Sequence, residues 1–134
     1  MKQPSFEVQQ SVVIFAKNKK RVSAFYRETL GLTASVEEPS HDVLCGSGVE
    51  LVIHAIPRKY ATDIVISKPP KVREDTAIKP AFYVADLEVV RAAEEKTGGF
   101  VKPRDQAWDI RRSVVLDGHD PEGNVVQFKQ RVGG

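Results

Sequence analysis

The order of apolar and polar residues in the first third of the chain predicts a strand followed by a helix. The run 12–16 is rich in β-branched and aromatic residues, as strands are. After it, four apolar residues recur at the spacing of one helix face: Val22, Phe25, Tyr26 and Leu30. Asn18 can cap the start of this helix, and Gly31 can end it because glycine adopts a positive φ at low cost.

Three further strands are expected before residue 57. Short strand patterns cover residues 33–36 and 42–45, with a polar turn between them, and residues 49–56 form the strongest strand pattern of this half. Gly46-Ser47-Gly48 predicts the hairpin turn that joins the last two strands. The first half therefore has the order β-α-β-β-β.

The same order of elements returns after a polar linker at about residues 58–78, which contains two adjacent prolines. The second half begins with a strand at residues 81–84 and a helix that Asp86 caps and Gly98-Gly99 ends. The strands expected after this helix start at residue 100 and cover residues 113–116 and 125–129, and residues 108–111 lead into the first arm of the final hairpin. The Asp117–Gly123 segment is expected to be a loop, with Trp108 in the loop before this final hairpin.

The two halves align with each other. Ser11 aligns with Lys79 and Phe15 with Tyr83 at the same numerical offset, and after the longer second loop Glu50 aligns with Gln127. We therefore predict one domain over residues 1–134, built from two divergent modules at about residues 6–57 and 79–131.

Composition narrows the classes of protein. A chain of 134 residues with 41% hydrophobic and 28% charged residues is typical of a soluble globular domain. The single cysteine, Cys45, excludes an internal disulfide and fits a reducing compartment. No stretch is apolar enough for a signal peptide or a membrane span, so we expect a cytoplasmic protein without membrane contact. The net charge of +2 gives no argument for nucleic-acid binding.

Three segments carry a resemblance to a known family. The first is the turn His119-Asp120-Pro121-Glu122-Gly123-Asn124, which leads into a strand. The second is Trp108-Asp109-Ile110-Arg111, which precedes this turn in the chain. The third is residues 21–32, which contain Phe-Tyr and end in Leu-Gly-Leu. This combination resembles the glyoxalase / bleomycin-resistance / extradiol-dioxygenase group, the vicinal oxygen chelate superfamily. Asp109 stands where that family usually has glycine. The resemblance implies an α+β fold in which two βαβββ modules form a curved, half-barrel-like mixed sheet with a concave cleft.

The resemblance also implies four positions for metal ligands, one on the first and one on the last strand of each module. In this sequence they are Ser11, Glu50, Lys79 and Gln127. Only Glu50 is a good ligand, and the positive charge of Lys79 would repel a cation. We therefore expect no divalent metal and no other cofactor. His54 shares a face with Glu50 but lies roughly 13 Å from it by strand rise, too far to share an ion.

A cleft without a metal remains able to bind a small molecule. Lys79 is expected either to pair with Glu50 across the floor or to orient a ligand, and Trp108 either to stack on a planar ligand or to pack on the sheet edge. His41 and His119 are expected to be exposed in turns. The candidate ligand-binding residues are Ser11, Phe15, Glu50, His54, Lys79, Tyr83, Trp108, Arg112 and Gln127.

Lys79, Lys129 and Arg112 favour a neutral or anionic aromatic ligand over a cationic one. The first hypothesis is a metal-free binding protein, a homodimer by the same resemblance. The alternative is a glyoxalase-like lyase or isomerase, or a dioxygenase-type oxygenase, with Glu50 as base or metal ligand. A third is a purely structural or interaction module, which would show no thermal shift with small molecules.

Overall fold

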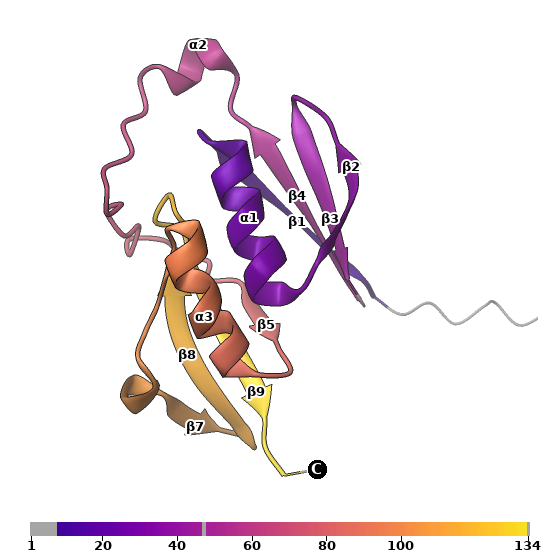
Figure 1. Ribbon diagram of the computed structural model, residues 1–134, viewed down its shortest axis with the longest axis vertical. Coiled ribbons are helices and arrows are strands. Elements are labelled where there is room, and N and C mark those ends of the chain that lie inside the picture. Colours follow the sequence, from indigo (N-terminus) through magenta and orange to yellow (C-terminus); the bar gives the residue numbers. More distant parts are fainter. Residues whose placement is uncertain (1–7, 47, 134) are drawn as a thin grey trace, which may run out of the picture.

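The computed structural model describes residues 8–46 and 48–133 (Figure 1). Ser47, in the expected hairpin turn, lies outside the described residues. The first half contains the expected elements in the expected order: β1 (Gln10–Ala16), α1 (Lys19–Leu30), β2 (Thr33–Glu37), β3 (His41–Gly46) and β4 (Val49–Ala55). Its four strands form one sheet in the order β1-β4-β3-β2, in which β1 is parallel to β4.

The second half repeats this topology with one addition. Its elements are β5 (Ala81–Tyr83), α3 (Leu87–Thr97), β6 (Phe100–Val101), the 3₁₀ turn η1 (Arg104–Gln106), β7 (Trp108–Ile110), β8 (Ser113–His119) and β9 (Val125–Arg131). The sheet order is β5-β9-β8-β6, with β5 parallel to β9, and β7 pairs with β8 as an extra strand. The predicted α+β fold of two related modules is thus confirmed, as two mixed sheets without a closed barrel.

Both long helices begin and end where their sequence predicts. The side chain of Asn18 accepts a hydrogen bond from the backbone N–H of Arg21 at the start of α1, and Asp86 accepts one from Glu88 at the start of α3. Gly31 and Gly98 end the two helices with φ values of 65° and 82°. Local capping chemistry therefore fixes the limits of each helix.

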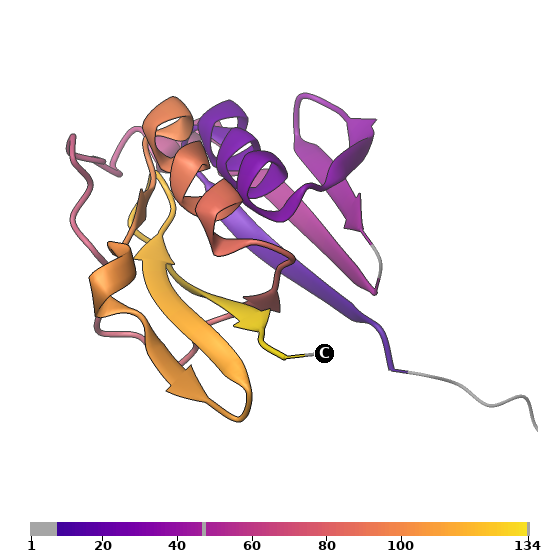
Figure 2. The same ribbon diagram turned by 60° about the horizontal axis from the view of Figure 1, so that its bottom comes forward.

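The helices α1 and α3 lie side by side, against the sheets (Figures 1 and 2). Phe25 of α1 is central to the core, with its ring centroid 5.0 Å from that of Tyr26 and 6.3 Å from that of Phe128 in β9. Each fully buried side chain of this size contributes about 1.5–3 kcal/mol. One continuous core therefore joins the two modules.

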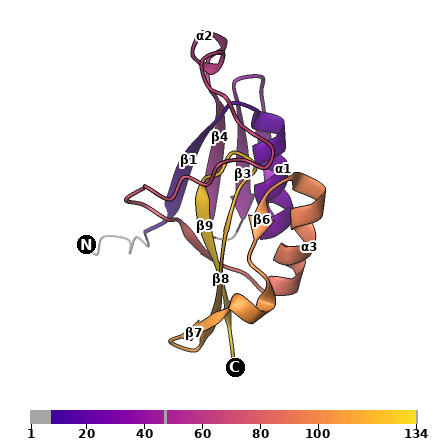
Figure 3. The ribbon, with the colours of Figure 1, turned by 90° about the vertical axis from the view of Figure 1, so that its left-hand side faces the viewer.

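Residues 56–80 connect the modules and include the short helix α2 (Arg58–Ala61). Figure 3 shows this linker passing across the sheets on its way from α2 to β5. It is held to the second module by a hydrogen bond of 2.8 Å from the backbone N–H of Arg73 to the carbonyl oxygen of Gly123. None of the helices in the described part of the chain is both long and apolar enough to cross a membrane.

Two expectations about the second module are wrong. The strand β8 continues through Asp117, Gly118 and His119, so the loop before β9 contains only residues 120–124. The glycine inside β8 had suggested a loop, but its lack of a side chain is needed there because a Cβ atom would run into the carbonyl oxygen of Phe100. Trp108 is the first residue of β7 rather than part of a loop.

Candidate functional site

Each sheet has one face toward the helices and one face away from them, which we call its open face. In β1, Val12, Ile14 and Ala16 pack toward the core, so alternation places Ser11, Val13 and Phe15 on the open face. The side chains of Val13 and Phe15 are 53% and 61% exposed. Val13 and Phe15 therefore leave apolar surface exposed on this face.

Ser11 and Glu50 are direct neighbours on the open face of the first sheet. They are register partners in the parallel pair of β1 and β4, and the Ser11 hydroxyl donates a hydrogen bond of 2.7 Å to Glu50 Oε1. The carboxylate therefore bonds within its own module. Of the two roles left open for Lys79, the pairing with Glu50 is wrong, because Lys79 Nζ bonds to Asp117.

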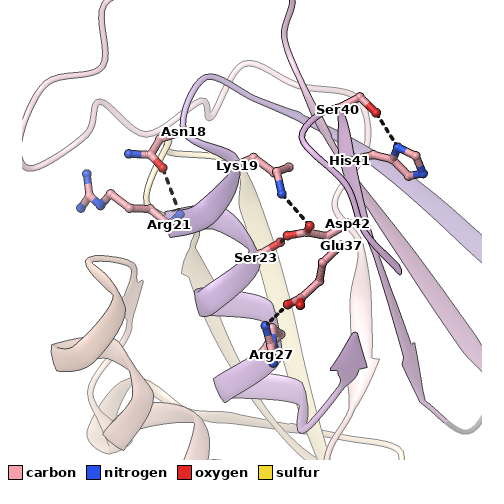
Figure 4. A network of polar contacts seen from close by, with 9 residues as sticks. All are labelled: Asn18, Lys19, Arg21, Ser23, Arg27, Glu37, Ser40, His41 and Asp42. Carbon is pink, nitrogen blue, oxygen red and sulfur yellow. Dashed lines mark hydrogen bonds and ion pairs between the residues drawn. The ribbon is translucent and has the colours of Figure 1, made fainter. Parts of the chain in front are cut away.

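His54 lies beside a second histidine. It is the register partner of both Phe15 and His41, and its ring centroid lies 5.7 Å from that of Phe15 and 6.1 Å from that of His41. His41 was expected in an exposed turn, but it is the first residue of β3 and half-buried, with its Nδ1 2.8 Å from Ser40 Oγ (Figure 4). The next residue, Asp42, is bound by Lys19 and Ser23 of α1, and this contact fixes the start of β3.

Lys79 and Gln127 meet at an aspartate that sequence reasoning had assigned to a loop. Asp117 Oδ1 lies 3.0 Å from Lys79 Nζ and 3.1 Å from Gln127 Nε2, and both groups donate hydrogen bonds to it. Burial opposes ionisation of Asp117, but these two donors and the charges of Lys79 and Lys102 outweigh it and lower the pKa of its carboxyl. The register partner of Gln127 in β5 is Ala81, two residues beyond Lys79, so Lys79 and Gln127 are not register partners as Ser11 and Glu50 are.

A cationic and aromatic row crosses the open face of the second sheet. Tyr83, Lys129, Val115 and Trp108 are register neighbours in four adjoining strands. Lys129 Nζ lies 5.7 Å and the Arg131 guanidinium 4.3 Å from the centroid of the Tyr83 ring, within the range of cation–π attraction. Trp108 therefore belongs to the same face as Lys79 and Gln127.

Arg112 stands apart from the other candidate residues. It lies in the two-residue turn between β7 and β8, where Arg111 and Arg112 have φ values of 46° and 61°. These values match the turn type that suits the twist of a tight hairpin, although arginine is rare there. Arg112 is exposed at the tip of this hairpin.

The open face of the second sheet contains a cavity of about 620 Å³ beneath the linker. Its apolar lining comes from Pro69, Pro70, Val72, Phe100 and Val125, and its polar lining includes Glu74, Thr76, Lys79, Lys102, Asp117 and His119. A second cavity, of about 520 Å³, lies between β1 and the linker and is lined in part by Val13, Phe15 and Ile78. Both volumes suit a small organic molecule.

His119 is a site residue that sequence reasoning missed. It was expected to be exposed in a loop, but it ends β8 and is only 8% exposed. Its ring stacks on Phe100 with centroids 5.5 Å apart, and its Nδ1 lies 2.9 Å from the carbonyl oxygen of Asp120. If the strand pattern of β8 is continued to its end, alternation places His119 on the same face as Asp117.

The side chains at the four positions where the resemblance implies metal ligands are engaged with other side chains. Ser11 and Glu50 bond to each other, and Lys79 and Gln127 bond to Asp117. Within residues 8–46 and 48–133, no three histidine, cysteine, aspartate or glutamate side chains are close enough together to hold a metal. The ammonium group of Lys79, which bonds to Asp117, would also repel a cation.

Comparison with known proteins yields structural similarity without sequence similarity. No family model matches the sequence, and no curated protein is similar enough to be a relative. Among solved structures, a glyoxalase/bleomycin resistance protein/dioxygenase family enzyme from Burkholderia phytofirmans PsJN has a TM-score of 0.64 at 17% identity, over 91% of this chain and 97% of that one. A glyoxalase/bleomycin resistance protein from Albidiferax ferrireducens T118 has a TM-score of 0.64 at 16% identity, over 91% and 97%. The fosfomycin resistance protein FosX from Mesorhizobium loti has a TM-score of 0.64 at 9% identity, over 96% and 95%.

Proposed function

We propose that this chain, whose fold is that of the glyoxalase / bleomycin-resistance / dioxygenase superfamily, is a binding protein for a small organic molecule that needs no metal. The observation that carries the proposal is the cavity of about 620 Å³ on the open face of the second sheet. Apolar side chains form much of its wall, and a few polar groups converge on it, as in small-molecule sites generally.

The charges of this face favour an anion. At the cavity, the positive charges of Lys79 and Lys102 are matched by the carboxylates of Asp117 and Glu74, and Lys129 and Arg131 give the rest of the face an excess of positive charge. A carboxylate or phosphate on the ligand would be attracted to this excess, whereas an ammonium group would be repelled. The exposed aromatic residues Tyr83 and Trp108 provide surfaces for a planar ring. The ligand class is thus a neutral or anionic aromatic molecule.

We also propose that the protein binds its ligand without a metal ion. Support comes from the hydrogen bonds that already engage Glu50 and Gln127, and from the ammonium group of Lys79 beside Asp117. Glu50 Oε1 accepts the hydrogen bond from Ser11, and Glu50 does not line the cavity. We therefore place binding ahead of lyase or oxygenase chemistry with Glu50 as base or metal ligand.

A homodimer is the assembly we propose. The exposed side chains of Val13 and Phe15 leave an apolar strip on the first sheet. Burial of such a strip against a second copy would remove it from water at a gain of roughly 25 cal/mol per Å². Size-exclusion chromatography with light scattering measures the mass directly, and a monomer at micromolar concentration would reject the assembly.

Benzoate and benzylamine test the proposed ligand class because they have the same ring and opposite charge. Isothermal titration calorimetry on the full chain should show binding of benzoate and none, or much weaker binding, of benzylamine. Treatment with EDTA should leave the benzoate affinity unchanged. The variant Lys102→Ala should weaken benzoate binding on the order of fivefold, since partly exposed charge pairs contribute up to about 1 kcal/mol.

The matched control for Lys102→Ala is Lys96→Ala, which removes an exposed lysine from the last turn of α3. It should bind benzoate as the unaltered protein does. Tighter binding of benzylamine than of benzoate would refute the charge argument. A stoichiometric divalent ion that is required for benzoate binding would refute the metal-free function.

A further inference from the structure

His119 is held in one orientation at the wall of the larger cavity. Its ring stacks on Phe100, its register partner in β6, at an interplanar angle of 26°. Gly118, the preceding residue, leaves no room for a Cβ atom beside the backbone of Phe100, so β6 and β8 approach each other closely here. The stack and the strand pairing together leave the imidazole little freedom to turn.

The hydrogen bond of His119 determines which ring nitrogen carries the proton. Nδ1 lies 2.9 Å from the carbonyl oxygen of Asp120, and a carbonyl oxygen can only accept. Nδ1 is therefore the donor, and in the neutral imidazole the lone pair is on Nε2. A histidine fixed in this way presents a defined acceptor on its other side.

Among residues 8–46 and 48–133, Nε2 of His119 has no hydrogen-bond partner. In the described part of the chain, Arg91 Nε is the one side-chain nitrogen or oxygen that is fully buried without a hydrogen bond. Nε2 of His119 therefore reaches solvent although the residue as a whole is buried, and the solvent-filled space that His119 borders is the cavity. Lys79 and Lys102 border the same cavity.

We propose that His119 Nε2 accepts a hydrogen bond from an O–H or N–H group of the ligand, whose anionic group lies toward Lys79 and Lys102. The ligand class is then an aromatic acid that carries a hydroxyl or amino substituent. This inference rests on the proposed function, because it assigns a recognition group to the same cavity. A site that supplies an acceptor discriminates against analogues that lack the donor, since the acceptor then loses water without gaining a partner.

Two substitutions separate the acceptor from the structural role of the ring. His119→Asn keeps an amide N–H near the position of Nδ1 for the carbonyl of Asp120 and removes Nε2. His119→Gln places an amide oxygen near the position of Nε2. His41→Asn is the control, because His41 is a half-buried histidine whose Nδ1 lies 2.8 Å from Ser40 Oγ, away from the cavity lining.

The probes are benzoate and its 2-, 3- and 4-hydroxy derivatives, titrated calorimetrically into the full chain. The unaltered protein and His41→Asn should bind at least one hydroxybenzoate about tenfold more tightly than benzoate. His119→Asn should reduce this preference, measured against benzoate in the same variant, to about twofold or less, and His119→Gln should retain part of it. Thermal melting of each variant verifies that it is folded, and His119→Phe, which keeps the ring stack, replaces His119→Asn if that variant does not fold.

A preference that survives in His119→Asn overturns the role of Nε2. Equal binding of benzoate and all three hydroxybenzoates by the unaltered protein overturns the inference but leaves the proposed function in place. If none of the four anions binds, both the inference and the proposed function are rejected.

Discussion

The phenolic hydroxyl of Tyr26 donates a hydrogen bond of 2.8 Å to Asp120 Oδ2, across 94 positions of the chain. Tyr26 belongs to α1 of the first module, and Asp120 begins the turn before β9 of the second. Burial, together with the facing Asp120 carboxylate, raises the pKa of Tyr26 well above its ordinary value of 10.0. Two of the three sequence segments that carry the family resemblance therefore meet in one buried contact.

Tyr26→Phe should destabilise the protein by about 1–3 kcal/mol, because Asp120 loses a donor that no water can replace at a fully buried position. Urea unfolding followed by circular dichroism measures the free energy of unfolding. Tyr60→Phe is the control, since Tyr60 is exposed in α2. An equal midpoint for Tyr26→Phe and the unaltered protein would contradict the structural role of this bond.

The stability should depend on pH through Asp120. Burial raises the pKa of Asp120 above its ordinary value of 3.8, and hydrogen bonds from Asn124 and Tyr26 offset this only in part. The folded state therefore binds this proton more tightly than the unfolded state, and the resulting stability declines as pH rises from about 3.8 through the raised pKa. Asp120→Asn cannot titrate, so the stability of the unaltered protein relative to this variant should fall across that window. Urea unfolding at a series of pH values tests it, and a relative stability that rises with pH would contradict it.

Asp117 should show the opposite dependence. The pKa of its carboxyl is lowered, since donors from Lys79 and Gln127 overcome the effect of burial. The stability that this shift provides is present above about pH 3.8 and is lost as pH falls through the lowered pKa. The advantage of the unaltered protein over Asp117→Asn should therefore shrink as the solution is acidified below about pH 4. An advantage that grows on acidification would be inconsistent with the Lys79 contact.

Glu122 should stabilise the start of α1. Its two carboxylate oxygens accept hydrogen bonds of 2.8 Å and 2.6 Å from the backbone N–H groups of Lys17 and Asn18. A buried negative charge next to the first turn of a helix also interacts favourably with the helix dipole. Glu122→Gln should lower the free energy of unfolding by about 1–2 kcal/mol, whereas the exposed Glu28→Gln should change it by less than about 0.5 kcal/mol. Similar values for both variants would argue against this capping contact.

Gly123→Ala should cost more than Gly31→Ala, although both residues have positive φ values, 86° and 65°. A Cβ atom at Gly31 meets no atom within 4 Å, so that variant experiences only the backbone strain of about 1–2 kcal/mol. A Cβ atom at Gly123 would clash with the carbonyl oxygen of Lys71 and push the linker off the turn. Limited proteolysis should then cut the linker faster in Gly123→Ala. Equal stability and equal proteolysis of the two variants would show that the linker is not held at this turn.

The sequence by itself determined the elements whose causes are local. The apolar stripe of α1, the caps at Asn18 and Asp86, and the glycines that end both helices depend on contacts within a few residues, so pattern and residue type are sufficient to place them. The alternation along β1 likewise assigned Ser11 and Phe15 to the open face correctly, because side chains of a strand alternate whatever the neighbouring strand is.

The tertiary structure alone decided which residues from different strands come together. Alternation gives the face of a side chain but says nothing about register with a strand tens of residues away, so the sequence left open whether Lys79 pairs with Glu50, and only the structure places it beside Asp117. Gly118 suggested a loop by its residue type, whereas close approach to the backbone of Phe100 keeps it in β8 and brings His119 to the cavity. Register and close backbone approach are properties of the assembled core, and the site depends on both.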